Sequence, residues 1–248
     1  MRGADYLLVD VSNSFTKISF VRDGRHLQQR HLPTASIDGA RMATLVRGWE
    51  IRLAVISSVV PSRNAAFVLP GTPIHWVSHR SPLGVSVDYP RPSTIGADRL
   101  ANAAGCADRY GCPAIVVDFG TAVTFDVLSP DGAYVGGVIA PGLSSMTEYL
   151  HQRTALLPRL RLKAPARAIG RSTREAMLSG AVFGYRGLVR GICEAVAAEF
   201  PPDTKVPWIA TGGDAEVIAA EGLFSTVDPQ LTLHGLHCIA QRVENTPQ

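Results

Sequence analysis

A tight polar loop between two apolar strands occurs twice in this chain and restricts the folds that the chain can adopt. The first loop, Asp10–Ser14, lies between apolar runs at 7–9 and 18–21. The second loop, Asp118–Ala122, divides a similar apolar stretch at 114–127. In both copies an Asp-Gly pair, a strong hairpin signal, starts 13 positions after the first Asp of the loop: Asp23-Gly24 and Asp131-Gly132. The repeat predicts two α/β domains of similar plan.

The first loop has the composition of a phosphate-binding loop. Its small side chains allow backbone N–H groups to approach phosphate oxygens, and Ser12, Asn13 and Ser14 add hydroxyl and amide donors. Lys17, on the following strand, could reach a terminal phosphate. An Asx-type hairpin turn with a solvated lysine explains a single loop equally well, but the second copy favours phosphate binding. Two facing loops of this kind indicate a metal-bound polyphosphate held between two domains, and therefore phosphoryl transfer.

The second loop could hold a cation. Kinases need a divalent cation that bridges phosphate oxygens, and a monovalent ion can assist with an anionic product. Asp118, at a strand end, can bind either ion or its waters, Thr121 adds a hydroxyl, and Gly120 keeps side-chain bulk away from phosphate. Asp126 falls on the same strand face as Thr124. The favoured interpretation of Asp126 is a strand-end carboxylate facing water, and the alternative is support of the ion site.

The order of elements suggests a division near Gly111–Pro113 into domains of residues 1–112 and 113–248. Each half repeats strands, helix, strand, helix, strand and helix, and we expect a cleft between the halves. A capping box at Ser172–Glu175 marks the start of a long helix. The predicted helices span 37–49, 63–68, 97–110, 172–200 and 215–221, with a last helix from Leu231. Further strands are predicted at 26–32, 53–60, 74–77, 133–140 and 206–210.

The segment Gly96–Arg99 starts a helix after a loop rich in proline and glycine. Asp98 in the first turn complements the helix dipole, and Arg99 could simply be solvated. Alternatively, Asp98 is a general base that faces the cleft, and the Arg99 guanidinium grips a substrate carboxylate or the moving phosphoryl group. General-base assistance of this kind is worth a factor of about 10²–10⁴ in rate. The residues alone leave both interpretations open.

A pair of glycines follows a third apolar strand at Thr211–Gly213. Glycines there allow close approach of a planar ligand such as adenine, although a tight strand-to-helix turn needs them equally. Thr173, the first helical residue after the capping Ser172, could point its hydroxyl into the expected cleft.

Cysteine and histidine spacing indicates no metal motif. The cysteines form no CxxC pair and have no histidine at zinc-ligand spacing, so we expect reduced and mostly buried thiols at Cys106, Cys112, Cys193 and Cys238. Metal binding is also not expected at the histidine pairs, which are His75 with His79 and His234 with His237.

The bulk composition excludes several classes of function. Hydrophobic residues make up 46% and charged residues 18%, as in ordinary globular proteins. The formal net charge is only +3 and no basic run is interleaved with aromatics, so nucleic acid is not an expected partner. No apolar stretch has the length of a membrane span and the start does not resemble a signal peptide. We therefore expect a cytoplasmic protein without membrane contacts.

Five ordered motifs resemble those of the type III pantothenate kinases. They are Asp10–Ser14, Gly96–Arg99, Asp118–Ala122, Ile169–Thr173 and Thr211–Gly213, with Pro141-Gly142 and Leu156–Pro158 extending the match over nearly the whole chain. The resemblance implies a duplicated fold of the sugar kinase, chaperone and actin superfamily, working as a homodimer. It also implies ATP-dependent phosphorylation of pantothenate to 4'-phosphopantothenate, the first step toward coenzyme A.

The resemblance also implies a role for each motif. ATP, with Mg²⁺, would be bound by Asp10, Val11, Ser12, Asn13, Ser14, Phe15, Thr16, Lys17 and Thr121. Asp98 would accept the proton of the pantothenate hydroxyl, and Asp118 would hold a monovalent cation, K⁺ or NH₄⁺. Pantothenate would contact Tyr89, Gly96, Ala97, Asp98, Arg99 and Thr173.

One position departs from the family pattern, which has glycine where this chain has Ser12. If the loop needs a positive φ there, serine costs about 1 kcal/mol or more in strain, and ATP affinity falls. Two other functions stay open. One is a phosphatase or polyphosphate hydrolase of the same fold, in which Asp98 activates water. The other is a catalytically silent relative that binds a partner or regulates transcription.

Overall fold

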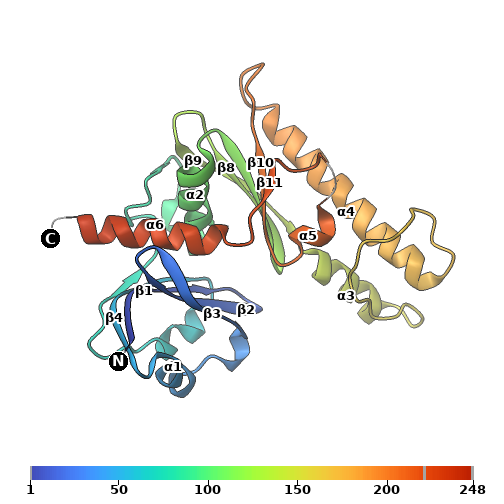
Figure 1. Cartoon of the computed structure of the whole chain (residues 1–248). Coiled ribbons are helices and arrows are strands. Elements are labelled where there is room, and N and C mark those ends of the chain that lie inside the picture. Colours follow the sequence, from blue (N-terminus) through green and yellow to red (C-terminus); the bar gives the residue numbers. More distant parts are fainter. Residues whose placement is uncertain (1, 220–221, 247–248) are drawn as a thin grey trace. The chain divides into compact units, whose positions relative to one another are not determined.

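The computed structural model describes residues 2–219 and 222–246, which divide into two compact units (Figure 1). The first unit contains Met1–Gly111, Pro130–Val135 and Gln230–Gln248. The second unit contains Cys112–Ser129 and Gly136–Pro229.

The first unit is built on a five-stranded sheet of order β3-β2-β1-β4-β5 (Figure 1). β1 pairs antiparallel with β2 and parallel with β4, which pairs parallel with β5. The predicted Asp23-Gly24 hairpin turn joins β2 to β3, and both residues have positive φ, 49° and 72°. The strands are β1 (Arg2–Val11), β2 (Phe15–Arg22), β3 (Arg25–Pro33), β4 (Trp49–Ser58) and β5 (Ile74–Trp76).

Helices cover both faces of this sheet because β1 buries its side chains on both sides. Tyr6 and Leu8 pack with residues of α2 and α6, whereas Leu7 and Val9 pack on the opposite face with Met42 of α1. The helices are α1 (Gly39–Val46), α2 (Ala97–Tyr110) and α6 (Leu231–Asn245), with 3-10 turns at Thr34–Ser36, Pro61–Ala66 and Pro92–Thr94. A short strand, β6 (Ser86–Val87), pairs with Ala133 and Tyr134.

α2 and α6 lie side by side and touch through their backbones (Figure 1). A Cβ atom on Gly105 of α2 would lie 2.6 Å from the Leu231 carbonyl oxygen. A Cβ atom on Gly235 of α6 would collide with the Ala101 carbonyl oxygen. Because glycine has no Cβ, these two positions allow the close crossing of the helices.

The second unit repeats the plan of the first. Its strands follow the order β11-β10-β7-β8-β9, with β7 antiparallel to β8 and parallel to β10, which pairs parallel with β11. This arrangement corresponds to β5-β4-β1-β2-β3 of the first sheet and confirms the predicted duplication. The strands are β7 (Ala114–Phe119), β8 (Ala122–Leu128), β9 (Ala133–Pro141), β10 (Trp208–Gly212) and β11 (Thr226–Val227), and the helices are α3 (Leu143–Arg153), α4 (Thr173–Ala197) and α5 (Ala215–Ile218).

The core of the second unit joins α4 to the central strands. Val182, Tyr185 and Val189 of α4 are buried in one cluster with Ile115 and Val117 of β7. These three helix positions recur every three or four residues, so they form one apolar face of α4. The predicted capping box starts this helix, because the Ser172 hydroxyl accepts a hydrogen bond from the Glu175 N–H at 3.2 Å.

Some predicted elements differ from the structure at their ends. The helix expected at 37–49 is wrong at both ends, since α1 is Gly39–Val46 and Trp49 begins β4. Gly48, with a φ of 79°, separates the two elements. The helix expected at 63–68 is the 3-10 turn Pro61–Ala66. The predicted helix 215–221 is seen as α5, and its expected last residues, 220–221, lie outside the described residues.

The chain first passes from one unit to the other between Gly111 and Cys112. Two later segments group with the first unit: Pro130–Val135, which pairs with β6, and Gln230–Gln248, which carries α6. The compact units are therefore made of several chain segments each, and the division into domains of residues 1–112 and 113–248 stays a prediction. None of the described helices combines the length and apolar character needed to cross a membrane.

Candidate active site

Asp10 is a buried carboxylate at the end of β1, with 4% of its surface exposed. Its Oδ1 accepts a hydrogen bond from the Ser57 hydroxyl at 2.8 Å, and its Oδ2 accepts one from the Ser12 hydroxyl at 3.1 Å. Ser57 lies opposite Asp10 in the parallel pairing of β1 and β4. Two hydroxyl donors therefore satisfy the carboxylate and hold it in one orientation beside the loop.

Two hydrogen bonds at the Ser12 backbone fix the loop after Asp10. The Ser12 N–H donates to the Phe15 carbonyl at 3.2 Å, and the Thr34 hydroxyl donates to the Ser12 carbonyl at 2.6 Å. Among the described residues, the non-glycine residues with positive φ are Asp23 and Asp203. Ser12 therefore carries no left-handed strain, and the penalty considered for serine at this position does not arise.

Lys17, on β2, places a positive charge beside the Asp10 loop. Lys17 lies opposite Asp10 in the antiparallel pairing of β1 and β2, and opposite His31 in the pairing of β2 and β3. Burial, followed by the charge of Lys17, lowers the pKa of His31. The positive charge of Lys17 thus disfavours protonation of the His31 imidazole.

Asp98 sits in the first turn of α2, where its carboxylate folds back over Gly96. Its Oδ1 accepts a hydrogen bond from the Arg99 N–H at 2.8 Å. A Cβ atom on Gly96 would lie only 2.5 Å from this same oxygen. Gly96 is thus needed for the observed position of the carboxylate.

Val59 connects the Asp10 loop to the start of α2. Its N–H donates to the Val11 carbonyl at 3.0 Å, and its Cγ1 lies 3.5 Å from the position that a Cβ atom on Gly96 would occupy. Both functional segments of the first unit therefore lie at the carboxyl ends of the parallel strands β1 and β4. This end of an open α/β sheet is where ligands usually bind.

Two tyrosines support Arg99. The Arg99 guanidinium carbon lies 5.8 Å from the ring centroid of Tyr134, a distance at which a cation is attracted to an aromatic face. Tyr134 is fully buried and makes an edge contact with Tyr89, with ring centroids 6.4 Å apart. The Tyr134 ring therefore restricts the guanidinium, and Tyr89 restricts the ring.

In the second unit, Asp118 lies against a glycine of the neighbouring strand. Gly212 has a φ of 92°, and a Cβ atom there would lie 2.5 Å from Asp118 Oδ1 and 2.6 Å from the Phe119 nitrogen. Thr211, the register partner of Asp118, is fully buried, and its Oγ1 has no hydrogen-bond partner among the described residues. A carboxylate and an unsatisfied hydroxyl thus lie on adjacent strands at the ends that carry the second loop.

The second loop is held from behind by the start of α3. The Thr121 carbonyl accepts hydrogen bonds from the Gly142 N–H at 3.2 Å and from the Ser145 hydroxyl at 2.9 Å. The Thr121 side chain stays exposed.

Sequence reasoning overlooked Asp214, the residue after the paired glycines. Burial raises the pKa of its carboxyl, although a hydrogen bond from the Ser144 hydroxyl at 3.1 Å works in the opposite direction. Burial, followed by the charge of Asp214, also raises the pKa of Tyr185. An acid directly after a strand and two glycines is a signal that could have identified Asp214.

Asp126 requires a correction. The sequence favoured a carboxylate facing water, but Asp126 is fully buried within β8. The strand extends to Leu128, so Asp126 is not at its end.

A family model described as type III pantothenate kinase matches residues 6–195. The chain belongs to the type III pantothenate kinase family. A relative in Akkermansia muciniphila named type III pantothenate kinase is 49% identical over 241 residues, covering 95% of this chain and 98% of the relative. Another of that name in Methylacidiphilum infernorum is 40% identical over 237 residues, covering 95% and 88%. Membership of this family makes the chain a kinase.

Solved structures share the fold at low sequence identity. A Campylobacter jejuni protein named as a Baf family transcriptional activator is 18% identical with a TM-score of 0.61, covering 97% of this chain and 100% of that chain. A Sinorhizobium meliloti protein named as a 2-dehydro-3-deoxygalactonokinase is 14% identical with a TM-score of 0.60, covering 96% and 99%. These likenesses show the fold alone. With the two-sheet architecture, they confirm the expected actin-like fold of the pantothenate kinase.

The structure gathers the predicted kinase residues within each unit. The first unit brings the Asp10–Lys17 loop close to Gly96–Arg99, through Val59. The second unit brings Asp118 close to Thr211–Gly213, whereas the Thr121 backbone lies against Gly142. Thr173 lies elsewhere in that unit, where it is exposed and lines a groove of about 1080 Å³ between α3 and α4.

The cysteines are reduced, as predicted. The prediction that no histidine lies at metal-ligand spacing from a cysteine was wrong. The four cysteines are thiols, and Cys106, Cys193 and Cys238 are buried. However, His234 precedes Cys238 by one helical turn on α6, and the two side chains meet. The spacing of four residues within a helix was the overlooked signal.

Proposed function

We propose that this protein transfers the γ-phosphoryl group of ATP to the primary hydroxyl of pantothenate and forms 4'-phosphopantothenate for coenzyme A synthesis. The observation that carries the proposal is the family match over residues 6–195, which includes both polar loops and the start of α2. Relatives that cover 95% of the chain carry the same family name.

ATP phosphates would be bound by the loop Asp10–Lys17, and Thr121 would contact the nucleotide from the second loop. The Ser12 backbone is unstrained and the Asn13 and Ser14 side chains are exposed, so N–H and hydroxyl donors can face an anion. Lys17 supplies the positive charge. Mg²⁺ bound with ATP would neutralise charge on the phosphate oxygens.

Asp98 would accept the hydroxyl proton of pantothenate as the new P–O bond forms. An alcohol is too weak an acid to attack unaided, so a carboxylate held in one place is the required group. The hydrogen bond from the Arg99 N–H fixes one Asp98 oxygen, and the absent side chain of Gly96 leaves room for it. Most of the rate acceleration would come from positioning and from charge stabilisation.

The carboxylate of pantothenate would be bound by Arg99, whose guanidinium is held over the Tyr134 ring. A guanidinium can donate two parallel hydrogen bonds to a carboxylate. Tyr89 would form a wall of the same site together with Gly96 and Ala97. Thr173 is a further residue that the family resemblance assigns to pantothenate, and its hydroxyl-bearing side chain lines the groove of the second unit.

A monovalent cation, K⁺ or NH₄⁺, would be held by Asp118. The residues present fit such an ion, because Asp118 and Thr211 are register partners on adjacent strands and Thr211 Oγ1 is buried and unsatisfied among the described residues. Oxygen ligands of this type suit hard cations. The ion would supply positive charge near the anionic product.

The protein would work as a cytoplasmic homodimer. The cytoplasm supplies the ATP for this reaction. The groove between α3 and α4 is almost entirely apolar, and large exposed apolar side chains occur around it, including Met146, Tyr149, Leu150 and Phe183. A surface of this kind favours association with a second copy. Sedimentation velocity should give the mass of a dimer, and Met146→Glu should shift it toward the monomer.

The decisive experiment is a coupled assay of ADP formation in potassium buffer, with and without pantothenate. The proposed kinase forms ADP only when pantothenate is present, and mass spectrometry detects the phosphorylated product. ADP release that does not depend on pantothenate would instead identify a hydrolase. A protein that forms no ADP under either condition would be a silent relative.

A further inference from the structure

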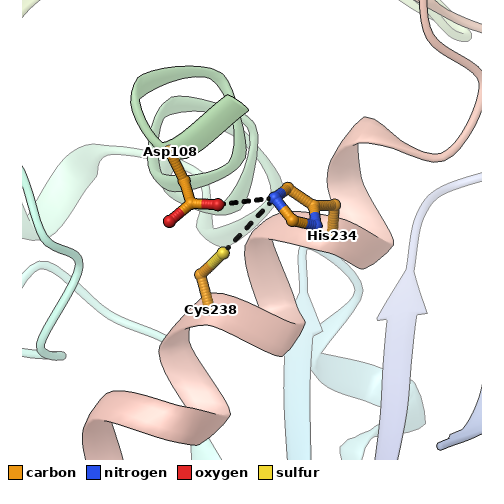
Figure 2. Close-up of side chains that lie close together, drawn as sticks. All are labelled: Asp108, His234 and Cys238. Atoms are coloured by element: carbon orange, nitrogen blue, oxygen red, sulfur yellow. Dashed lines mark hydrogen bonds and ion pairs between the residues drawn. The ribbon is translucent and has the colours of Figure 1, made fainter. Parts of the chain in front are cut away.

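We propose that Asp108, His234 and Cys238 form a zinc-binding site in the first unit, near the opposite end of α2 from Asp98. Their ligand atoms all lie within 4.8 Å of one another (Figure 2). His234 Nε2 lies 2.9 Å from Asp108 Oδ2 and 3.6 Å from Cys238 Sγ. Carboxylate oxygen, imidazole nitrogen and thiolate sulfur are the three donor types that zinc takes in proteins.

The nitrogen–sulfur distance is close to an edge of a zinc tetrahedron, and the nitrogen–oxygen distance is shorter than one. With Zn–N and Zn–S bonds of about 2.0 and 2.3 Å, a tetrahedral angle places nitrogen and sulfur about 3.5 Å apart. The observed separation of His234 Nε2 and Cys238 Sγ is 3.6 Å. Nitrogen and oxygen would lie about 3.3 Å apart around zinc. Asp108 Oδ2 would therefore move outward by a few tenths of an ångström from its present hydrogen bond, and Asp108 is exposed enough to do so.

The same geometry argues against a cysteine nucleophile. In a catalytic relay, the nucleophile and the orienting carboxylate contact opposite nitrogens of the imidazole. Here Asp108 and Cys238 both face Nε2 of His234 (Figure 2). Burial also raises the pKa of the Cys238 thiol to about 11, which disfavours a reactive thiolate in the absence of a metal. Convergence on a single point is what a metal ion requires.

The helix crossing determines the positions of the three ligands. His234 and Cys238 are four residues apart on α6 and lie on one face of it. Asp108 is three residues after Gly105 on α2. The crossing at Gly105 and Gly235 brings the two backbones into contact and sets Asp108 opposite the α6 pair (Figure 2). The site is therefore built on two rigid helices rather than on a loop.

Charge around the cluster suits a divalent cation. Zinc displaces the thiol proton of Cys238, and it binds Nε2 of His234 when the imidazole proton is on Nδ1. One thiolate and one carboxylate then balance the charge of Zn²⁺. Arg242 faces the other carboxylate oxygen, with its NH2 atom 3.7 Å from Asp108 Oδ1, and its guanidinium is seated against Gly84. Arg242 also acts on the Cys238 thiol, so its guanidinium faces two of the three ligands and must turn away from the sulfur when an ion binds.

One of the three ligands, Cys238, borders an open cavity, and Asp108 is exposed at the surface. Cys238 and Arg242 line an open cavity of about 480 Å³, together with Gln241 and Asn245. A cavity of this size admits a hydrated ion and leaves space for a water as the fourth ligand. Bound zinc would connect α2, whose first turn carries Asp98, to α6.

The test uses the full chain with its purification tag removed and its metals stripped by a chelator. Zinc is titrated against a chromogenic indicator, and Co²⁺ is used as a spectroscopic probe. We expect one equivalent of zinc to bind, a Co²⁺ spectrum with tetrahedral bands and a thiolate charge-transfer band, and a higher melting temperature with zinc. Cys238→Ser should weaken zinc binding by more than about tenfold and abolish the charge-transfer band. Cys112→Ser is the matched control and should keep both.

Asp108→Asn is a second variant that keeps the shape of an exposed side chain, so it protects the test from a folding defect. It should weaken zinc binding by about tenfold or more and leave the circular dichroism spectrum unchanged. Three results would overturn the proposal: no stoichiometric zinc binding by the wild type, a Co²⁺ spectrum without thiolate character, or equal zinc affinity in wild type and Cys238→Ser.

Discussion

The carboxylate of Asp98 occupies the space that a side chain at Gly96 would need. A Cβ atom on Gly96 would lie 2.5 Å from Asp98 Oδ1, which is well inside van der Waals contact. Gly96, the N-cap residue of α2, therefore has a function that is separate from helix capping. It allows the carboxylate to fold back and to accept the Arg99 N–H.

Gly96→Ala should lower kcat/KM for pantothenate by roughly 10- to 100-fold, because a catalytic group displaced by about 1 Å can cost a factor of 10². Steady-state kinetics check this. Gly39→Ala is the matched control. Gly39 is the first residue of α1, and a Cβ atom there would meet no described atom within 4 Å. Equal losses in both variants would contradict the role given to Gly96.

Asp98→Asn should lower kcat by about 10²–10⁴ and leave ATP affinity unchanged, because the amide keeps the size of the side chain but cannot accept the proton. The coupled assay gives kcat, and isothermal titration calorimetry gives the affinity for ATP. A variant that keeps the wild-type rate would remove Asp98 as the proton acceptor.

Gly212→Ala should destabilise the fold by about 1–3 kcal/mol, since a methyl group would be forced against Asp118 and the backbone has a positive φ. Gly213→Ala is the control, because a Cβ atom there would meet no described atom within 4 Å. Thermal unfolding of both variants is the measurement. Similar melting temperatures would show that the space at Gly212 is not restricted.

Replacing Na⁺ with K⁺ at constant ionic strength should raise the rate of pantothenate phosphorylation, because Asp118 and Thr211 offer oxygen ligands to a monovalent ion. Asp118→Asn should remove this preference. Choline chloride serves as a reference salt without a metal ion. Equal rates in K⁺ and Na⁺ for the wild type would refute the ion assignment.

Asp214 should make the stability of the protein depend on pH. Burial raises the pKa of its carboxyl in the folded state, so its contribution to stability is fully present below the unfolded-state pKa and is lost as pH rises through the folded-state pKa. Asp214→Asn should therefore raise the melting temperature more at pH 7 than at pH 3. Asp203→Asn, at an exposed position of the same unit, is the control. If Asp214→Asn changed the melting temperature equally at pH 3 and pH 7, the proposed contribution of Asp214 to the pH dependence would be contradicted.

Much of the fold followed from local patterns. Gly111 and the first-turn acid Asp98 delimit α2, and the prediction 97–110 equals its observed bounds. The duplicated hairpins were visible because each polar loop lies between two apolar strands and the second strand ends at Asp-Gly. Trp49 was misplaced because its apolar spacing continues that of α1, and the left-handed Gly48 that separates them has no signature in periodicity.

The site was less accessible to sequence reasoning, because it depends on contacts between distant residues. Asp126 is fully buried although it lies on a strand with alternating polar residues, because side-chain burial depends on what packs on that face of the sheet. The meeting of Asp108 with His234 and Cys238 depends on a helix crossing between segments that are far apart in the sequence. Pairings of this kind are set by tertiary packing, which has no local signal.

The packing of α6 against α2 also has a consequence for biosynthesis. Leu233, Leu236 and Ile239 of α6 fill one face of the sheet made by β1 and β4. The ribosome makes those strands first and α6 long afterwards, so the nascent chain must keep this apolar surface uncovered while the second unit is being translated. A chaperone that binds exposed apolar segments would therefore act on the first unit during that interval.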